Sequence, residues 1–305
     1  MRSGNKALIQ ILIIVCFFFL LLIFFAVWTM KAIQGKSGLS LDSFDKSAIA
    51  VVEIEGVIMD AKKVVEKLER AEKMKEIKAI VVRINSPGGA VGPSQEIYEE
   101  IRRIDKNIPV FASFGAIAAS GGYYIGAATR KIYSNKGTLT GSIGVIMQFV
   151  DLSKLYEFAK VSPETLKAGK YKDIGQTARP MTSEERGLME GMLKGVHKQF
   201  IDDILEVRKD RIKGKIEDLA QGQIFSGEDA YKYGLVDEIA GLWAAGRKIH
   251  EEIGLKGEFA GFKYIKDKKK ISLWDLADGL DDVVSNFKLL GQSLGGVVPM
   301  FKMAI

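Results

Sequence analysis

The residues Ile77-Lys-Ala-Ile-Val-Val-Arg-Ile-Asn-Ser-Pro-Gly-Gly89 are the clearest indication of the fold class of this chain. Its first eight residues form a nearly continuous apolar run, which is typical of a strand buried on both faces of a parallel sheet. Asn85 to Gly89 break the strand, and a helical pattern follows to about Asp105. A strand, a glycine-rich turn and a helix in this order predict one unit of an α/β fold with a mainly parallel sheet.

The same alternation continues on both sides of this stretch. Further strands are predicted at Ala48–Met59, Val110–Phe114, Lys131–Tyr133 and Ser142–Met147, with an extended segment at Leu166–Ile174. Helices are predicted at Ala61–Lys75, from about Ala118, from the capping-box pattern at Thr182 to about Lys209, after Ser226 and at Leu242–Ile253. We therefore predict one domain at 48–265, followed at 266–305 by an amphipathic helix and an apolar tail. That last segment is expected to pack on the domain, or alternatively to lie on a membrane or in an apolar groove.

The composition excludes several common kinds of site. The 305 residues include one cysteine and two histidines, so a disulfide framework, a cysteine-rich zinc site and a histidine metal centre are not expected. We predict no metal and no cofactor. The net charge of +6 would suit a polyanion, but residues 1–36 hold four basic and no acidic residues, which leaves a net of only +2 on the rest. Nucleic acid is therefore not a predicted partner.

The N-terminal segment has the pattern of a membrane anchor. Ala7 to Met30 is an uncharged, apolar run in which only two residues are polar, and as a helix it would span about 36 Å, enough for a hydrocarbon core of ~30 Å. A signal peptide has a shorter apolar region and a small-residue cleavage site directly after it. We predict a leader and anchor at 1–36 and a tether at 37–47. The short basic leader favours a cytoplasmic N-terminus and an extracytoplasmic domain at the cell (inner) membrane.

Two glycine-rich segments are candidates for chemistry. In Gly115-Ala-Ile-Ala-Ala-Ser-Gly-Gly-Tyr-Tyr124, the hydroxyl of Ser120 is surrounded by small and apolar side chains. Small neighbours let a substrate backbone approach, and this favours a nucleophile at the start of a helix. The alternative is a small-residue packing face with an incidental serine. The turn Asn85–Gly89 presents backbone N–H groups suited to an oxyanion, although such a turn also needs glycine for conformational reasons alone.

A nucleophilic serine needs a base, and the histidines are poor candidates. His197 and His250 lie in charge-rich helical segments far along the chain. A lysine serves if its amine is neutral, and lowering the pKa of an amine from 10.4 toward 7 costs about 4 kcal/mol, which burial in a water-poor site supplies. Lys167, Lys170 and Lys172 are all eligible, and spacing does not choose among them.

Six motifs follow one another in this chain. They are Asn85-Ser-Pro-Gly-Gly89, Ala118-Ala-Ser-Gly-Gly-Tyr-Tyr124, Leu139-Thr-Gly-Ser-Ile-Gly-Val-Ile146, Gly169-Lys-Tyr-Lys-Asp-Ile174, Met181-Thr-Ser-Glu-Glu-Arg186 and Gly234-Leu-Val-Asp-Glu238. Together they resemble the signal peptide peptidase A family of membrane-anchored serine proteases. The resemblance runs from about Ala48 to Ile253 and fits the short form, which has one catalytic domain.

The resemblance implies a fold and a set of roles. The fold is that of the Clp protease and crotonase superfamily, here behind a single transmembrane helix. Ser120 matches the nucleophile, Lys172 the general base, and Ser142 a serine that orients the lysine amine. Gly89, together with the Ser120 N–H, matches the oxyanion donors.

The implied function is that of a serine endopeptidase with an acyl-enzyme intermediate. It would cleave hydrophobic peptides such as remnant signal peptides after their release from preproteins. Family members form homo-oligomers, and in short forms neighbouring subunits share the dyad.

Three other functions are less consistent with the sequence. Crotonase-type enzymes act on acyl-CoA thioesters with similar glycine-rich geometry, but they are soluble and rely on carboxylates. A non-catalytic membrane scaffold would not need both Ser120 and Lys172. A Ser/His/Asp protease is disfavoured because the first histidine is His197. We also expect the apolar end, Met300–Ile305, to enter a substrate groove.

Overall fold

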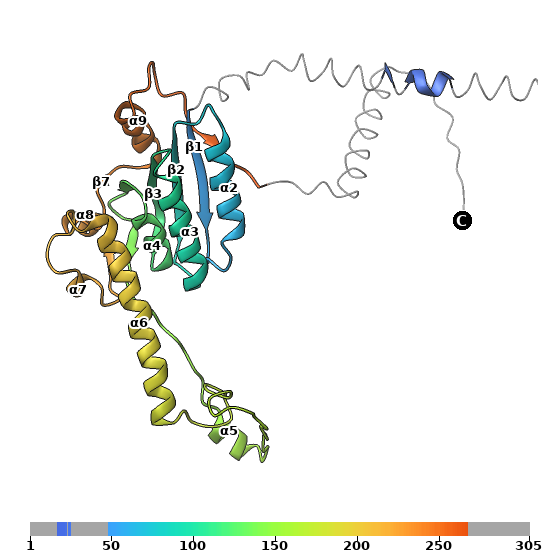
Figure 1. The fold of residues 1–305 in the computed structure, drawn as a ribbon, viewed down its shortest axis with the longest axis vertical. Helices are drawn as coiled ribbons and strands as arrows, with labels where there is room; N and C mark the ends of the chain where they lie inside the picture. Colours follow the sequence, from blue (N-terminus) through green and yellow to red (C-terminus); the bar gives the residue numbers. More distant parts are fainter. Residues whose placement is uncertain (1–16, 23, 26–47, 268–305) are drawn as a thin grey trace, which may run out of the picture. The chain divides into compact units, whose positions relative to one another are not determined.

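The computed structural model describes residues 17–22, 24–25 and 48–267 (Figure 1). The strands are β1 (Ile49–Glu55), β2 (Ala79–Ser86), β3 (Val110–Ala119), β4 (Ile132–Ser134), β5 (Leu139–Gly141), β6 (Ile224–Ser226), β7 (Glu238–Ile239) and β8 (Lys263–Tyr264). The helices are α2 (Lys62–Lys73), α3 (Val91–Ile104), α4 (Gly121–Ala127), α5 (Ser153–Phe158), α6 (Ser183–Arg208), α7 (Ile216–Leu219), α8 (Gly227–Lys232) and α9 (Leu242–Glu252).

The strands form one mixed sheet in the order β6-β5-β3-β2-β1-β8, with β4 beside β3 and β7 beside β4. Among these described strands, only β5 and β6 pair antiparallel, and the other pairs are parallel. The predicted α/β fold with a mainly parallel sheet is therefore confirmed. The central strands are buried on both faces, which explains their continuous apolar sequences.

Helices cover the sheet on both faces (Figure 1). The larger apolar cluster joins one face of the sheet to α2, α3, α4 and the C-terminal half of α6, through residues such as Leu68, Ile101 and Ile204. A smaller cluster joins the other face to α9 through Ala245 and Ile249. The carboxyl end of β3 and the start of α4 thus lie between packed layers.

Strand β3 is longer than the sequence predicts. It continues to Ala119, and the helix expected from about Ala118 begins only at Gly121. The carboxamide oxygen of Asn85 accepts hydrogen bonds from the N–H groups of Ala116 (3.1 Å) and Ile117 (3.3 Å). These bonds lie where the pairing of β2 and β3 shifts register. A side chain of β2 thus holds the end of β3 in an extended conformation, although the two segments are about 30 positions apart in the sequence.

Helix α6 connects this sheet to a segment that we call the arm, residues 146–182. Figure 1 shows α6 running from the sheet to α5, which lies at its far end. The predicted capping box is confirmed, because Thr182 accepts from the Glu185 N–H and Glu185 bonds back to the Thr182 N–H. Two predictions in this region are wrong. The segment expected to be extended at Leu166–Ile174 forms turns from residue 170 onward, and residues 142–147, expected to form a strand, follow the end of β5 at Gly141 without strand structure.

The two ends of the chain fall largely outside the described residues. Within the ranges 17–22, 24–25 and 48–267, no helix is both long and apolar enough to cross a membrane. Most of the predicted span at 7–30 and the tether at 37–47 lie beyond these ranges. The chain divides into two units, Met1–Ile265 and Lys266–Ile305, and the predicted C-terminal helix and tail, with Met300–Ile305, also lie outside.

Candidate active site

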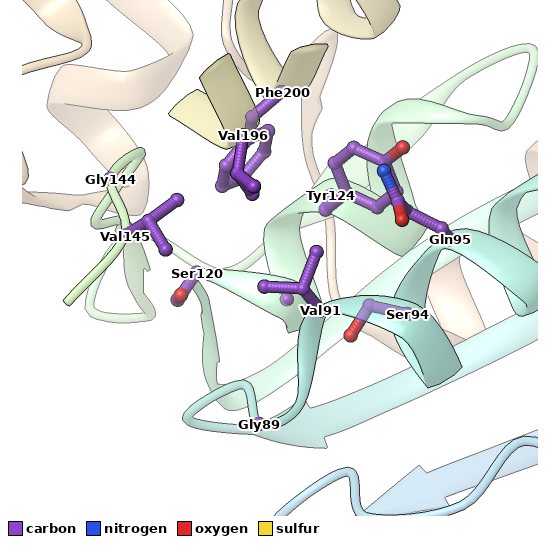
Figure 2. Close-up of a pocket in the computed structure, with 11 residues that line it drawn as sticks. Gly89, Val91, Ser94, Gln95, Ser120, Tyr124, Gly144, Val145, Val196 and Phe200 are labelled. Atoms are coloured by element: carbon purple, nitrogen blue, oxygen red, sulfur yellow. The ribbon is translucent and has the colours of Figure 1, made fainter. Parts of the chain in front are cut away.

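Ser120 lies at the junction between β3 and α4 (Figure 2). Its φ of 52° and ψ of −121° are values that residues other than glycine rarely adopt. Two hydrogen bonds hold the strained residue: its N–H donates to the Gly141 carbonyl, and its carbonyl accepts from the Tyr124 N–H, both at 2.9 Å. A serine held in a strained strand-to-helix turn is typical of a nucleophile.

Two glycines from distant parts of the sequence surround this serine. A Cβ atom on Gly88 would lie 2.8 Å from both Ser120 Cβ and Gly121 N, and one on Gly121 would lie 2.5 Å from Ser94 Oγ. Both distances are too short for a real side chain. The two glycine-rich segments are therefore in contact, and their small residues permit this close approach around Ser120.

Two backbone N–H groups lie beside Ser120 and have no hydrogen-bond acceptor within the part of the chain that the structure describes. They belong to Gly89 and Gly121, which both line the pocket at Ser120. A Cβ on Gly121 would lie 3.4 Å from Gly89 N, so the two donors are neighbours. Gly121 is the first residue of α4, where a helix leaves its N–H groups unsatisfied.

This geometry corrects one expectation about the oxyanion donors. The Ser120 N–H, expected to act with Gly89, is already bonded to Gly141. The available partner of Gly89 is the N–H of Gly121. Sequence reasoning missed this donor because the strained turn of Ser120, which directs its N–H to β5, appears only in the folded chain.

The structure brings Ser142 close to Ser120. Ala119 of β3 and Gly141 of β5 are paired in register, so the residues that follow them leave neighbouring strands about 5 Å apart. Ser142 also has a positive φ, 50°, and its N–H donates to the Gln223 carbonyl at 2.8 Å. The serine expected to orient a lysine amine is thus beside the expected nucleophile.

An apolar pocket opens at Ser120 (Figure 2). Its lining comes from α3, α4, α6 and the segment after β5: Gly89, Val91, Ser94, Gln95, Ser120, Gly121, Tyr124, Gly144, Val145, Val196 and Phe200. The rings of Tyr124 and Phe200 pack edge to face at 4.9 Å. The Tyr124 hydroxyl donates to the Asp203 carboxylate, and burial is the main reason why the pKa of Tyr124 is raised. A neutral, fixed tyrosine wall suits an uncharged side chain of a substrate.

Lys172 is not among the residues that line this pocket. It lies on the arm, which enters α6 at its first residue, Ser183. Val196, the first α6 residue in the pocket, comes 13 residues later, which is about 20 Å along a helix. The structure therefore separates the expected base from Ser120 within one copy of the chain.

The structure distinguishes the three lysines that spacing leaves equivalent. Lys167 pairs with the Asp173 carboxylate, and Lys170 pairs with Glu184 at 2.6 Å. Within residues 48–267, the side chain of Lys172 has no hydrogen bond or ion pair in the structure, and the residue is exposed. Lys172 is thus the lysine of the three whose amine is available to another molecule.

The fold and the residues around Ser120 are together typical of one kind of enzyme. A parallel-sheet α/β domain with a strained serine, two free N–H donors and an apolar pocket is typical of enzymes that attack a carbonyl carbon with a serine. Comparison with known proteins agrees. Residues 41–139 match the model of the Clp protease family, and residues 102–256, about half of the chain, match that of peptidase family S49. The chain belongs to peptidase family S49.

Individual relatives support the same conclusion. A relative from Synechocystis sp. named as a protease is 38% identical over 206 residues, which cover 66% of this chain and 74% of the relative. The chloroplastic serine protease SPPA of Arabidopsis thaliana is 32% identical over 274 residues, covering 88% of this chain but only 39% of that protein. A relative from Enterococcus faecium named as signal peptide peptidase SppA is 32% identical over 237 residues, covering 74% and 69%. These matches support a serine protease, and they confirm the resemblance to the signal peptide peptidase A family.

Proposed function

We propose that this chain is a serine endopeptidase in which Ser120 is the nucleophile and Lys172 of a neighbouring copy is the general base. The observation that carries the proposal is the strained Ser120, with the free N–H groups of Gly89 and Gly121 beside it. Donors fixed in this way stabilise charge that develops only in the transition state. The site therefore favours acyl transfer over simple binding.

The proposed reaction needs only protein groups and water. A neutral Lys172 amine accepts the Ser120 proton while the hydroxyl oxygen attacks the peptide carbonyl carbon. Gly89 and Gly121 donate hydrogen bonds to the resulting oxyanion. The protonated amine then gives its proton to the leaving nitrogen, and the C–N bond breaks. Water, with its proton taken by the same amine, hydrolyses the acyl-enzyme.

A second copy of the chain is required because α6 keeps Lys172 away from Ser120 in the first. The arm also carries large apolar side chains that the described residues leave uncovered: Ile146, Phe158 and Leu166 are 89%, 86% and 90% exposed. Exposed apolar groups of this size on a projecting segment favour burial against another protein surface. A ring of copies, each arm reaching the pocket of its neighbour, would complete every site.

The pocket supports a substrate with uncharged side chains, and we propose hydrophobic peptides such as remnant signal peptides. Val91, Val145, Val196 and Phe200 give the pocket walls an apolar character. The apolar run at residues 7–30 would hold the enzyme, as a single-pass protein with an extracytoplasmic domain, at the membrane where such peptides are released. In alkaline carbonate without detergent, the full chain should stay with the membranes, whereas a chain without residues 1–36 should be released. Release of the full chain by carbonate alone would argue against this location.

A subunit-mixing experiment tests the shared dyad. Ser120→Ala and Lys172→Ala are each expected to lower peptide hydrolysis at least about 1,000-fold. When the two inactive full-length variants are assembled together in equal amounts, about one quarter of the sites receive an intact serine and an intact lysine from adjacent copies in a ring. Recovery of that fraction of activity supports the proposal.

The controls separate the parts of this proposal. Each variant assembled alone should stay inactive at the same oligomer mass. If the mixture also stays inactive while both variants assemble, the dyad is not shared between copies. If Lys172→Ala alone keeps wild-type activity, Lys172 is not the base.

A further inference from the structure

Lys172 lies at the centre of a tight turn whose backbone is closed by glycines. Gly169 and Gly175, on either side, have φ values of 106° and 76°, which side-chain-bearing residues avoid. A Cβ on Gly175 would also lie 2.4 Å from the ring of Phe149. Inside the turn, the Lys172 N–H donates to the Gly169 carbonyl at 3.3 Å. Two glycines in a left-handed conformation and one backbone hydrogen bond therefore define the conformation of this turn.

A second lysine braces this turn from one side. The Lys167 amine donates to the Lys170 carbonyl at 3.1 Å and to the Asp173 carboxylate. These two acceptors lie before and after Lys172 in the chain. One ammonium group thus bridges the turn and fixes the backbone on both sides of the proposed base.

A chain of charged groups joins the turn to α6. Asp173 Oδ2 accepts from Arg179 Nε at 3.1 Å, and the same guanidinium donates to both oxygens of Glu185, at 2.8 and 2.5 Å. Glu185 also accepts from the N–H of Thr182 at 2.9 Å as part of the capping box. The side chains of Asp173 and Glu185 are only 7% and 5% exposed, so this network is shielded in an otherwise exposed arm.

We propose that Asp173 and Arg179 are positioning residues for Lys172. The inference rests on the proposed function, in which Lys172 must reach a serine of another copy. A lysine side chain has four flexible carbons, so its reach is defined only if its backbone is fixed. The Asp173–Arg179 pair fixes that backbone to the first turn of α6, whereas the Lys172 amine itself has no partner among residues 48–267.

The test uses Arg179→Gln and Asp173→Asn in the full chain, with Lys73→Gln as the control. Lys73 forms an exposed ion pair with Glu69 in α2, 3.1 Å long and remote from the arm. Loss of either positioning residue is expected to lower kcat about 10- to 100-fold, because small displacements of a catalytic group have effects of this size. KM should change less than about twofold, since the pocket at Ser120 is unaltered.

A rescue variant distinguishes positioning from general support of the arm. Arg179→Lys keeps the positive charge but loses the planar fork that holds two carboxylates, so kcat should recover partly relative to Arg179→Gln. Oligomer mass is measured for every variant, and kcat is expressed per assembled subunit. A merely structural role would reduce the amount of assembled enzyme and leave this normalised kcat unchanged.

The outcomes separate this inference from the proposed function. An active Lys172→Ala variant would overturn both. An inactive Lys172→Ala together with a wild-type normalised kcat for Arg179→Gln would overturn the positioning role alone. A fall in kcat for Arg179→Gln and Asp173→Asn, with Lys73→Gln unaffected, is the result expected.

Discussion

Around Ser120 the chain is packed so closely that single glycines decide the geometry, whereas around Lys172 a network of ion pairs does so. The serine region lies between layers of the sheet and its helices, with Gly88, Ser120 and Gly121 in direct contact. The arm has exposed apolar side chains and is held to α6 by Asp173, Arg179 and neighbouring charges. One half of the proposed site is therefore complete within a single copy, and the other half is presented outward.

The two regions are stabilised by different interactions. Strain at Ser120 is maintained by the surrounding core, which a single copy already possesses. The arm has no apolar core of its own, and its charged groups hold its internal shape while its large apolar side chains stay exposed. Helix α6 belongs to both regions, so substitutions at its two ends can be compared directly.

The largest expected effect is on the core end of α6. Arg208 has a fully buried side chain that bonds Asp237 at 2.9 and 3.0 Å. Arg208→Met should leave that carboxylate without its buried partner and lower the free energy of unfolding by about 3–5 kcal/mol. Arg211→Gln, which removes an exposed contact to the same carboxylate at 3.3 Å, should cost about 1 kcal/mol or less. Denaturant unfolding measures the free energy of unfolding of both variants, and an equal decrease in the two would contradict this prediction.

The next largest effect is expected on the rate of peptide hydrolysis, in a variant that still folds. Gly121→Ala would force a side chain against Ser94 Oγ and shift the Gly121 N–H, so peptide hydrolysis should fall about 100- to 1,000-fold, as for loss of an oxyanion donor. Gly187→Ala, at a position of α6 with open space around it, is the matched control. It should keep wild-type activity and unfold at the same or higher denaturant concentration. If Gly121→Ala kept wild-type activity, the Gly121 N–H would not be an oxyanion donor.

Helix caps offer a smaller, matched comparison. Thr182 caps α6 at the arm, and Ser226 caps α8 in the core, each by accepting from an N–H three residues later. Replacing either by alanine should cost about 1 kcal/mol locally. Thr182→Ala should speed hydrogen exchange in the first turns of α6 with little change in Tm, whereas Ser226→Ala should lower Tm. The reverse pattern would show that the arm end of α6 is coupled to global unfolding.

Acid should weaken the arm before the core. The Arg179 guanidinium is the main cause that lowers the pKa of Glu185 to about 2, and the hydrogen bond from Lys167 is the main cause that lowers the pKa of Asp173. Carboxylates with lowered pKa values contribute stability above their unfolded values near 4, and this contribution is lost as the pH falls through the folded values. Amide hydrogen exchange in the arm, corrected for its intrinsic dependence on pH, should therefore become faster as the pH falls from about 4 to about 2. If hydrogen exchange in the arm and in the core accelerated over the same pH range, the arm would not be the more acid-sensitive region.

Local sequence patterns predicted much of this structure. The apolar run before Asn85, the capping box at Thr182 and the small residues around Ser120 depend on residues only a few positions apart, so their strand, helix and turn preferences are visible in the chain. The sequence also made Ser120 a candidate nucleophile, beside the alternative of a small-residue packing face, because a hydroxyl among glycines and alanines has a distinctive pattern. The choice of Lys172 came from family resemblance, and the structure adds that Lys167 and Lys170 form ion pairs, whereas the Lys172 amine has no partner within residues 48–267.

Which groups lie next to one another depends on long-range packing, which local sequence patterns do not reveal. The register of β3 and β5 directs the Ser120 N–H to Gly141 and so makes Gly121 the free donor. The length of helix α6 keeps Lys172 away from Ser120 within one copy of the chain. The 52 positions between the two residues in the sequence do not by themselves predict this separation. Strand register and helix packing are set by side chains contributed from many distant segments. For this reason the residue types present in the sequence set which reactive groups are available, whereas the fold set the distance between Ser120 and Lys172 within one copy of the chain.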